Sequence, residues 1–77
     1  MEKGDGIVVS EIPPVGENIR RLRTSQGLST GDVARRAETL QRNVQRWEKG
    51  EVVPSWPLMV RLSDALECEP YELWVTG

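Results

Sequence analysis

Two short apolar patterns lie close together in the stretch STGDVARRAETLQRNVQRWEKG, residues 29–50. The first predicts a helix that ends near Ala37, with a buried face of Val33, Ala34 and Ala37. The second predicts a helix over about residues 40–49 that Gly50 ends, and its inward residues are expected to be Leu40, Val44 and Trp47. Because only about three residues separate the two helices, they must cross at a steep angle, which is the geometry of a helix-turn-helix.

Three further helices are expected around this pair. One runs from about Val15 to Gln26, one begins after Ser55 as its N-cap, and a last short one begins at Pro70. The helix after Ser55 has an apolar face of Met59, Leu62 and Leu66. The predicted fold class is therefore all-α, with five helices over residues 15–77.

Residues 1–14 are expected to form a separate N-terminal arm. Pairs of glycines and prolines bracket the β-prone run IVVSEI, which is too short to be a stable strand alone. We expect this arm to be flexible or paired with a partner. Its acidity argues against an arm that enters a DNA minor groove.

The composition excludes several classes of protein. Seventy-seven residues, 38% hydrophobic and 29% charged, are typical of one small soluble domain. No apolar run approaches the ~20 residues of a membrane span, and the N-terminus does not resemble a secretory signal, so a cytoplasmic protein is expected. Cys68 is the only cysteine and histidine is absent, so no internal disulfide, no metal site and no cofactor are expected. An enzyme is not expected either, because the commonest general base is missing and no phosphate-binding loop is present.

The charge is unevenly distributed along the chain. The net charge is −2, yet residues 17–49 contain eight Arg and Lys residues against four Asp and Glu residues. A local positive field of this kind can bind phosphate although the whole chain is acidic. Charge alone, however, fits a solvated helical surface equally well.

Several motifs in register resemble the lambda-repressor-like (Cro/repressor, Xre-type) helix-turn-helix family. They are IRRLRTSQGLS, DVARRA, VQRWEKG, VPS and DALECEPYELW, and together they cover about residues 15–77. The resemblance implies a five-helix DNA-binding domain that binds palindromic operators as a homodimer and regulates transcription. Double-stranded DNA and a second copy of the chain are the partners it implies.

The helix over residues 40–49 is expected to read bases. With Val44 facing inward, helical geometry points Arg42, Gln45 and Arg46 outward and leaves Gln41 at the edge. Arginine and glutamine match the hydrogen-bonding edges of guanine and adenine. The family pattern gives the same role to Gln41, Arg42 and Arg46, with Gln45 nearby. The other interpretation is a merely solvated polar face.

The resemblance also implies residues that position the protein on DNA. Candidates for phosphate contacts are Thr30, Asn43, Lys49 and Ser55. Arg23 and Glu48 match a family ion pair that ties the first helix to the end of the recognition helix.

The last helix contains the candidate dimer interface, Leu73 and Trp74. An apolar pair so close to the end of a small domain either contacts a second copy or folds back on its own core. Trp56 likewise either covers the core or lies exposed. Cys68 occupies an apolar family position, which implies a buried thiol.

Glu38, Glu67 and Leu40 depart from the family pattern. The two glutamates stand where glycine is usual, and a left-handed backbone there would cost about 1 kcal/mol. Leu40 replaces the usual Ser or Thr at the start of the recognition helix, so Thr39 is the expected cap. By contrast, Ser29 is well placed to cap the preceding helix.

Two hypotheses from different classes follow. The first is a sequence-specific, repressor-like DNA-binding regulator. The second is a protein-interaction module of the same fold, such as an antitoxin or co-regulator, which uses its Trp-rich and acidic surfaces. They differ in salt dependence, because binding driven by phosphate contacts weakens steeply as salt rises.

Overall fold

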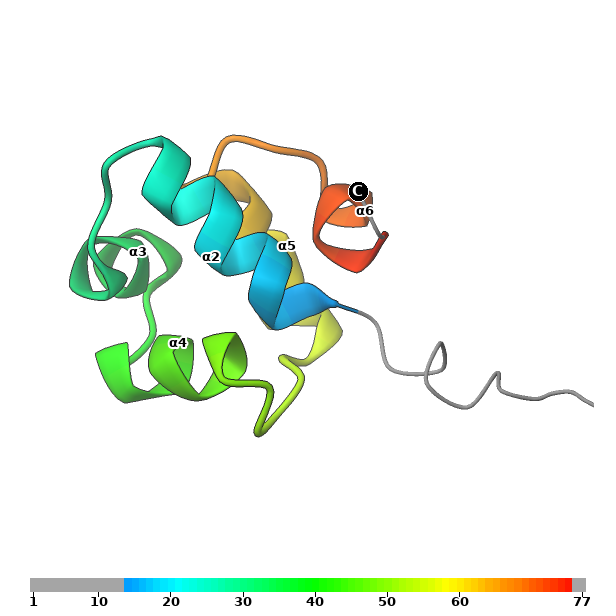
Figure 1. Cartoon of the computed structure of the whole chain (residues 1–77), viewed down its shortest axis with the longest axis horizontal. Coiled ribbons are helices and arrows are strands. Elements are labelled where there is room, and N and C mark those ends of the chain that lie inside the picture. Colours follow the sequence, from blue (N-terminus) through cyan, green and yellow to red (C-terminus); the bar gives the residue numbers. More distant parts are fainter. Residues whose placement is uncertain (1–13, 76–77) are drawn as a thin grey trace, which may run out of the picture.

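The computed structural model describes residues 14–75, which form five helices. They are α2 (Val15–Ser25), α3 (Thr30–Ala37), α4 (Gln41–Glu48), α5 (Trp56–Ala65) and α6 (Pro70–Trp74), as Figure 1 shows. The predicted all-α, five-helix fold is confirmed. The expected N-terminal arm lies outside the described residues, apart from Pro14.

The helices enclose one small core. Helix α3 packs against α4 and α5, whereas α2 contacts α4 and α6, and α5 contacts α6. In Figure 1, α6 lies at the opposite end of the molecule from α3. The largest fully buried apolar side chains are Val15, Ile19, Val33, Val44, Met59, Leu62, Leu66 and Leu73. Every helix contributes at least one of them, so the position of α4 depends on the whole core. None of the helices in residues 14–75 has the length and hydropathy to cross a lipid bilayer.

Helix α3 begins with a capping box. The backbone N–H of Asp32 donates to Oγ of Ser29 at 3.0 Å, and the Ser29 N–H donates back to a carboxylate oxygen of Asp32 at 2.9 Å. This satisfies two backbone donors, as the sequence predicted for Ser29. The bond from the Ser29 N–H to the Asp32 carboxylate is the main reason that the pKa of Asp32 lies below its usual value.

Glu38 and Glu67 end α3 and α5 in the left-handed region, with φ of 60° and 57°. In each case the next residue donates its N–H back into the helix: Thr39 to the Ala34 carbonyl and Cys68 to the Ser63 carbonyl, both at 2.9 Å. The turns therefore have the geometry that glycine favours, although glutamate occupies them.

Two polar side chains, one within α2 and one at its C-cap, donate hydrogen bonds to carbonyl groups at the ends of other helices. Asn18 is buried and its Nδ2 donates to the carbonyl oxygens of Leu73, at 2.9 Å, and Val75, at 2.8 Å. Nε2 of Gln26 donates to the carbonyl oxygen of Leu66 at 2.6 Å. These bonds anchor the ends of α6 and α5, where helices otherwise leave carbonyl groups unpaired.

Candidate nucleic-acid interface

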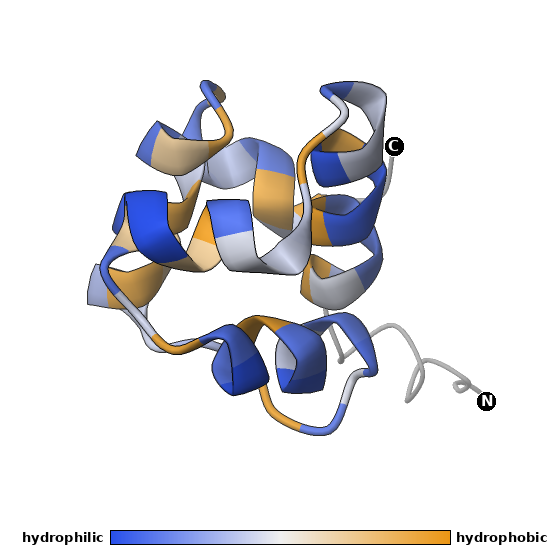
Figure 2. Ribbon diagram, turned by 90° about the vertical axis from the view of Figure 1, so that its left-hand side faces the viewer, coloured by the Kyte–Doolittle hydropathy of each residue, from blue (hydrophilic) through white to orange (hydrophobic). Residues whose placement is uncertain are grey.

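Helix α4 has one buried and one exposed face. Val44 and Trp47 are buried, with 0% and 4% of their surface exposed. The exposed residues include all four predicted base readers, Gln41, Arg42, Gln45 and Arg46. Figure 2 shows α4 along the lower edge of the molecule, with hydrophilic residues predominating. The helix thus presents arginine and glutamine side chains together on one accessible surface.

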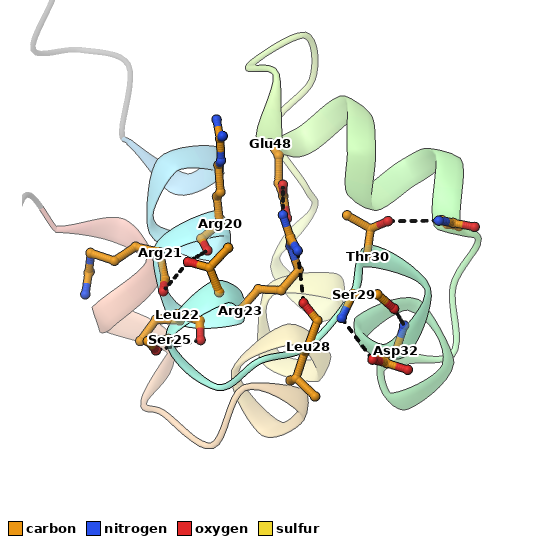
Figure 3. A network of polar contacts seen from close by, with 12 residues as sticks. Arg20, Arg21, Leu22, Arg23, Ser25, Leu28, Ser29, Thr30, Asp32 and Glu48 are labelled. Carbon is orange, nitrogen blue, oxygen red and sulfur yellow. Dashed lines mark hydrogen bonds and ion pairs between the residues drawn. The ribbon is translucent and has the colours of Figure 1, made fainter.

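The first turn of α4 is joined to the first turn of α3. Nε2 of Gln41 donates to the hydroxyl oxygen of Thr30 at 2.9 Å (Figure 3). The Gln41 side chain also lies next to Gly31, since a Cβ there would be 3.7 Å from its amide carbon. The N-termini of both helices are therefore neighbours, and both favour negative charge.

The start of α4 differs from the prediction. Leu40 is the N-cap, with extended backbone, and 61% of its surface is exposed. The expectation that Leu40 faces inward is wrong, because an N-cap residue leaves the helical path and its side chain no longer follows the helical periodicity. Thr39 does not cap α4 either; its hydroxyl accepts a hydrogen bond from Nδ2 of Asn43 at 3.0 Å.

The other predicted phosphate contacts differ in accessibility. Lys49 and Ser55 are exposed. Ser55 is the N-cap of α5 but makes no side-chain capping bond, so its hydroxyl is not engaged at the helix end. Thr30 and Asn43 are half-buried and already hydrogen-bonded to Gln41 and Thr39.

A two-bond ion pair holds the far end of α4. Nε of Arg23 lies 2.6 Å from one carboxylate oxygen of Glu48, and a terminal nitrogen lies 3.0 Å from the other (Figure 3). Arg23 also donates to the carbonyl oxygen of Leu28 at 2.9 Å. Only 15% of the Arg23 side chain and 10% of the Glu48 side chain is exposed. The hydrogen bond to Glu48 raises the pKa of Arg23. This pair, expected from the sequence, links α2, the following loop and α4.

A second ion pair involves a predicted base reader. Nε of Arg46 lies 3.4 Å from a carboxylate oxygen of Glu51, and both side chains are about half exposed. Exposed pairs of this kind contribute little to stability. Arg46 can therefore exchange Glu51 for another acceptor at little cost.

Aromatic side chains line an apolar groove away from α4. Its volume is about 300 Å³ and its lining consists of Trp56, Tyr71, Trp74 and Val75. Trp56 and Trp74 are 62% and 48% exposed, so both belong to the surface. Leu73 is fully buried in the core of its own chain, which is the second of the two places that the sequence left open for it. Tyr71 was not singled out, although its i, i+3 spacing to Trp74 could have indicated it.

Cys68 is half-buried against the core, less than the resemblance implies. Burial, followed by the charges of Glu72 and Glu69, raises the pKa of its thiol. Within residues 14–75, no three Cys, Asp or Glu side chains converge as metal ligands.

Comparisons with known proteins agree with this geometry. The family model described as "Helix-turn-helix domain" matches residues 14–73. The restriction-modification controller protein C.AhdI from Aeromonas hydrophila is 31% identical, with a TM-score of 0.78 over 84% of this chain and 98% of that one. The P22 c2 repressor in complex with a synthetic operator is 27% identical, with a TM-score of 0.74 over 78% and 91%.

At lower identity the likeness concerns the fold alone. SinR, described as the master regulator for biofilm formation and solved in complex with DNA, is 22% identical, with a TM-score of 0.73 over 77% of this chain and 95% of that one. No curated protein sequence matches the chain.

Proposed function

The chain belongs to the helix-turn-helix domain family, in its lambda-repressor-like form, and from this premise we propose that it is a sequence-specific DNA-binding regulator of transcription. It acts in the cytoplasm as a repressor-like homodimer on a palindromic operator. Helix α4 enters the major groove. Neither a cofactor nor a catalytic step is part of this proposal.

One observation carries the proposal: the exposed face of α4 combines Gln and Arg while Val44 and Trp47 hold the opposite face in the core. Arginine can donate two hydrogen bonds to guanine, and glutamine can both donate to and accept from adenine. The base readers are Gln41, Arg42, Gln45 and Arg46. Arg46 exchanges Glu51 for a base, a small change because that ion pair is exposed.

Phosphate contacts orient the domain on the duplex. Lys49 and Ser55 offer accessible groups on one side of α4. On the other side, Thr30 lies in the first turn of α3, where backbone N–H groups favour an anion. Asn43 contributes only if its amide leaves Thr39, so we place it last among the four.

The Arg23–Glu48 pair has a positioning role. It joins the end of α4 to α2 by two short charge-assisted bonds in a largely buried place. Since bases are read at hydrogen-bond distances, a small rotation of α4 would misplace its side chains. The pair therefore acts on DNA recognition indirectly, by holding the recognition helix at its angle.

The dimer forms through the aromatic groove. Three of its four lining residues are aromatic, and aromatic residues are enriched where proteins associate. A two-fold dimer would place its two recognition helices about one DNA turn, roughly 34 Å, apart. Trp74 replaces Leu73 as the central contact, because Leu73 is buried within its own chain.

Relatives support the DNA partner. The P22 c2 repressor, at 27% identity, is seen with an operator, and C.AhdI, at 31%, is a restriction-modification controller protein. The aromatic groove also favours the second candidate, a protein-interaction module, in which a partner protein would occupy the groove in place of a second copy of this chain.

Selection from a random DNA library with the purified protein tests the proposal. We expect a palindromic consensus whose binding weakens with salt, with a log–log slope of about −0.9 per phosphate contact. An enriched but asymmetric consensus would overturn the symmetric dimer. Absence of any enriched sequence, at low salt and high protein concentration, would refute DNA reading and favour the interaction module.

A further inference from the structure

Leu40 is the exposed apolar residue of the helix-turn-helix. Within residues 14–75, eight large apolar side chains are exposed, and among them only Leu40 belongs to the segment from α3 to the end of α4. It directly precedes Gln41 and stands at the tip of the recognition helix, with 61% of its surface exposed.

A polar residue at position 40 would stabilise the free protein more than Leu40 does. It is outside the core, and as the N-cap of α4 it makes no side-chain capping bond. Ser, Thr, Asp or Asn at an N-cap would accept a hydrogen bond from a free backbone N–H. A single exposed leucine is ordinary on a protein surface, but one that also displaces a cap breaks two local preferences at once. Such departures are expected at functional positions.

The neighbours of Leu40 leave its side chain accessible. Gln41 is bonded back to Thr30, and Asn43 is bonded back to Thr39. Both polar side chains that flank the start of α4 are thus tied to the preceding turn and helix. Leu40 consequently presents an accessible isobutyl group at the N-terminal end of α4, whose exposed residues include Arg42 and Gln45.

We propose that Leu40 contacts the C5-methyl group of a thymine and selects thymine at one position of each half-site. Among the four bases, thymine alone has an apolar group on its major-groove edge. Leucine offers no hydrogen bond, so it favours thymine and leaves the polar edges of other bases unpaired. The inference rests on the proposed DNA-reading role of α4 and adds a specificity-determining residue to it.

Deoxyuridine provides the test, since it differs from thymidine only by this methyl group. A duplex with the consensus selected by the wild-type protein is made with dU in place of dT at one position at a time, and the dissociation constant is measured. At one thymine per half-site we expect about fourfold weaker binding, the ~0.8 kcal/mol of one buried methyl group. Leu40→Ala should bind dT and dU duplexes equally at that position, whereas Leu40→Met should keep the difference.

A second measurement separates this role from a structural one. Leu40→Ser restores a capping hydroxyl, so its Tm should rise while the preference for dT over dU disappears. If wild-type and Leu40→Ala proteins lose the same affinity on dU substitution, or neither loses any, the contact with Leu40 is refuted. If the wild-type protein selects no sequence at all, the proposed function itself fails, and the contact with it.

Discussion

Gly16 of α2 and the carbonyl oxygen of Trp47 in α4 lie so close that a Cβ built on Gly16 would be 2.0 Å from that oxygen. No real side chain tolerates such a contact, so glycine is needed for the two backbones to approach. Together with the Arg23–Glu48 pair, this contact determines how closely α4 lies against the rest of the domain.

Gly16→Ala should therefore destabilise the fold. Alanine normally stabilises a helix relative to glycine, but here the helices must separate, and we expect a loss of about 1–3 kcal/mol in the free energy of unfolding. Gly31→Ala is the matched control, because its Cβ would meet nothing nearer than 3.7 Å and should stabilise α3 by up to ~1 kcal/mol. Urea denaturation of both variants checks this; equal stability of the two would contradict the close approach.

Replacing Glu38 or Glu67 by glycine should stabilise the protein. Both residues have a left-handed backbone that glycine adopts without strain, and allowing for the freer unfolded chain we expect a gain of about 0.5–1 kcal/mol each. Glu38→Gln keeps the backbone strain and removes only the charge, so its thermal unfolding should match the wild type. A gain for Glu38→Gln as large as for Glu38→Gly would assign the effect to charge instead.

Arg42→Ala combined with Arg46→Ala should abolish sequence preference and leave the fold intact. Both side chains are exposed, so the free energy of unfolding should change by no more than about 0.5 kcal/mol. Each lost base contact should cost about 1–3 kcal/mol of discrimination. Arg20→Ala with Arg61→Ala removes the same charge from other helices and should keep the preference. Selection of an unchanged consensus by the first double variant would mean that α4 is not the reading helix.

Trp74→Ala should weaken self-association. Trp74 contributes to the exposed groove, and a central tryptophan of an interface typically contributes 2 kcal/mol or more. Sedimentation velocity should show a shift from dimer to monomer, whereas Val53→Ala, an exposed apolar change outside the groove, should leave the distribution as in the wild type. An unchanged dimer in Trp74→Ala would exclude this surface.

Asp32 should make part of the stability of α3 dependent on pH. The Ser29 N–H bond lowers the pKa of this carboxyl in the folded state, so its stabilising effect is complete above the ordinary aspartate pKa of about 3.9 and is lost as pH falls further. The difference in unfolding free energy between the wild type and Asp32→Asn should be constant from about pH 7 to 5 and shrink below about pH 4. If the difference in unfolding free energy between the two proteins were still the same at pH 2, it would not come from the ionised Asp32 carboxylate.

Local patterns predicted much of the fold and part of the candidate site. Helical spacing located Val44 and Trp47 in the core, and the family resemblance, which has glycine at position 38, implied the left-handed backbone of Glu38. The orientation of Leu40 could not be predicted in this way, because the N-cap departs from helical dihedral angles. Whether Leu73 contacts a second copy or folds back on the core could not be decided in this way, because α6 packs on α2, which lies far away in the sequence, as well as on the neighbouring α5.

The close approach of α2 to α4 could not be predicted, because contacts between two backbones leave no apolar pattern in the sequence. Gly16 is required by a carbonyl oxygen of α4, and nothing in its neighbouring residues indicates this. Asn18 did leave a signal, since it lies between Val15 and Ile19 on the apolar face of α2. A polar residue in such a place indicates a buried hydrogen bond, although not its partner.

The buried amide of Asn18 has a consequence for how rigid a dimer would be. It fastens the end of α6, next to Trp74, to α2, and α2 is itself fixed to α4 by Gly16 and Arg23. In the proposed dimer, the surface that joins two protomers and the helix that reads DNA would then move as one body. The distance between the two copies of α4 would then be fixed. An operator with one base pair inserted between its half-sites would bind more weakly, because the dimer could not change that distance.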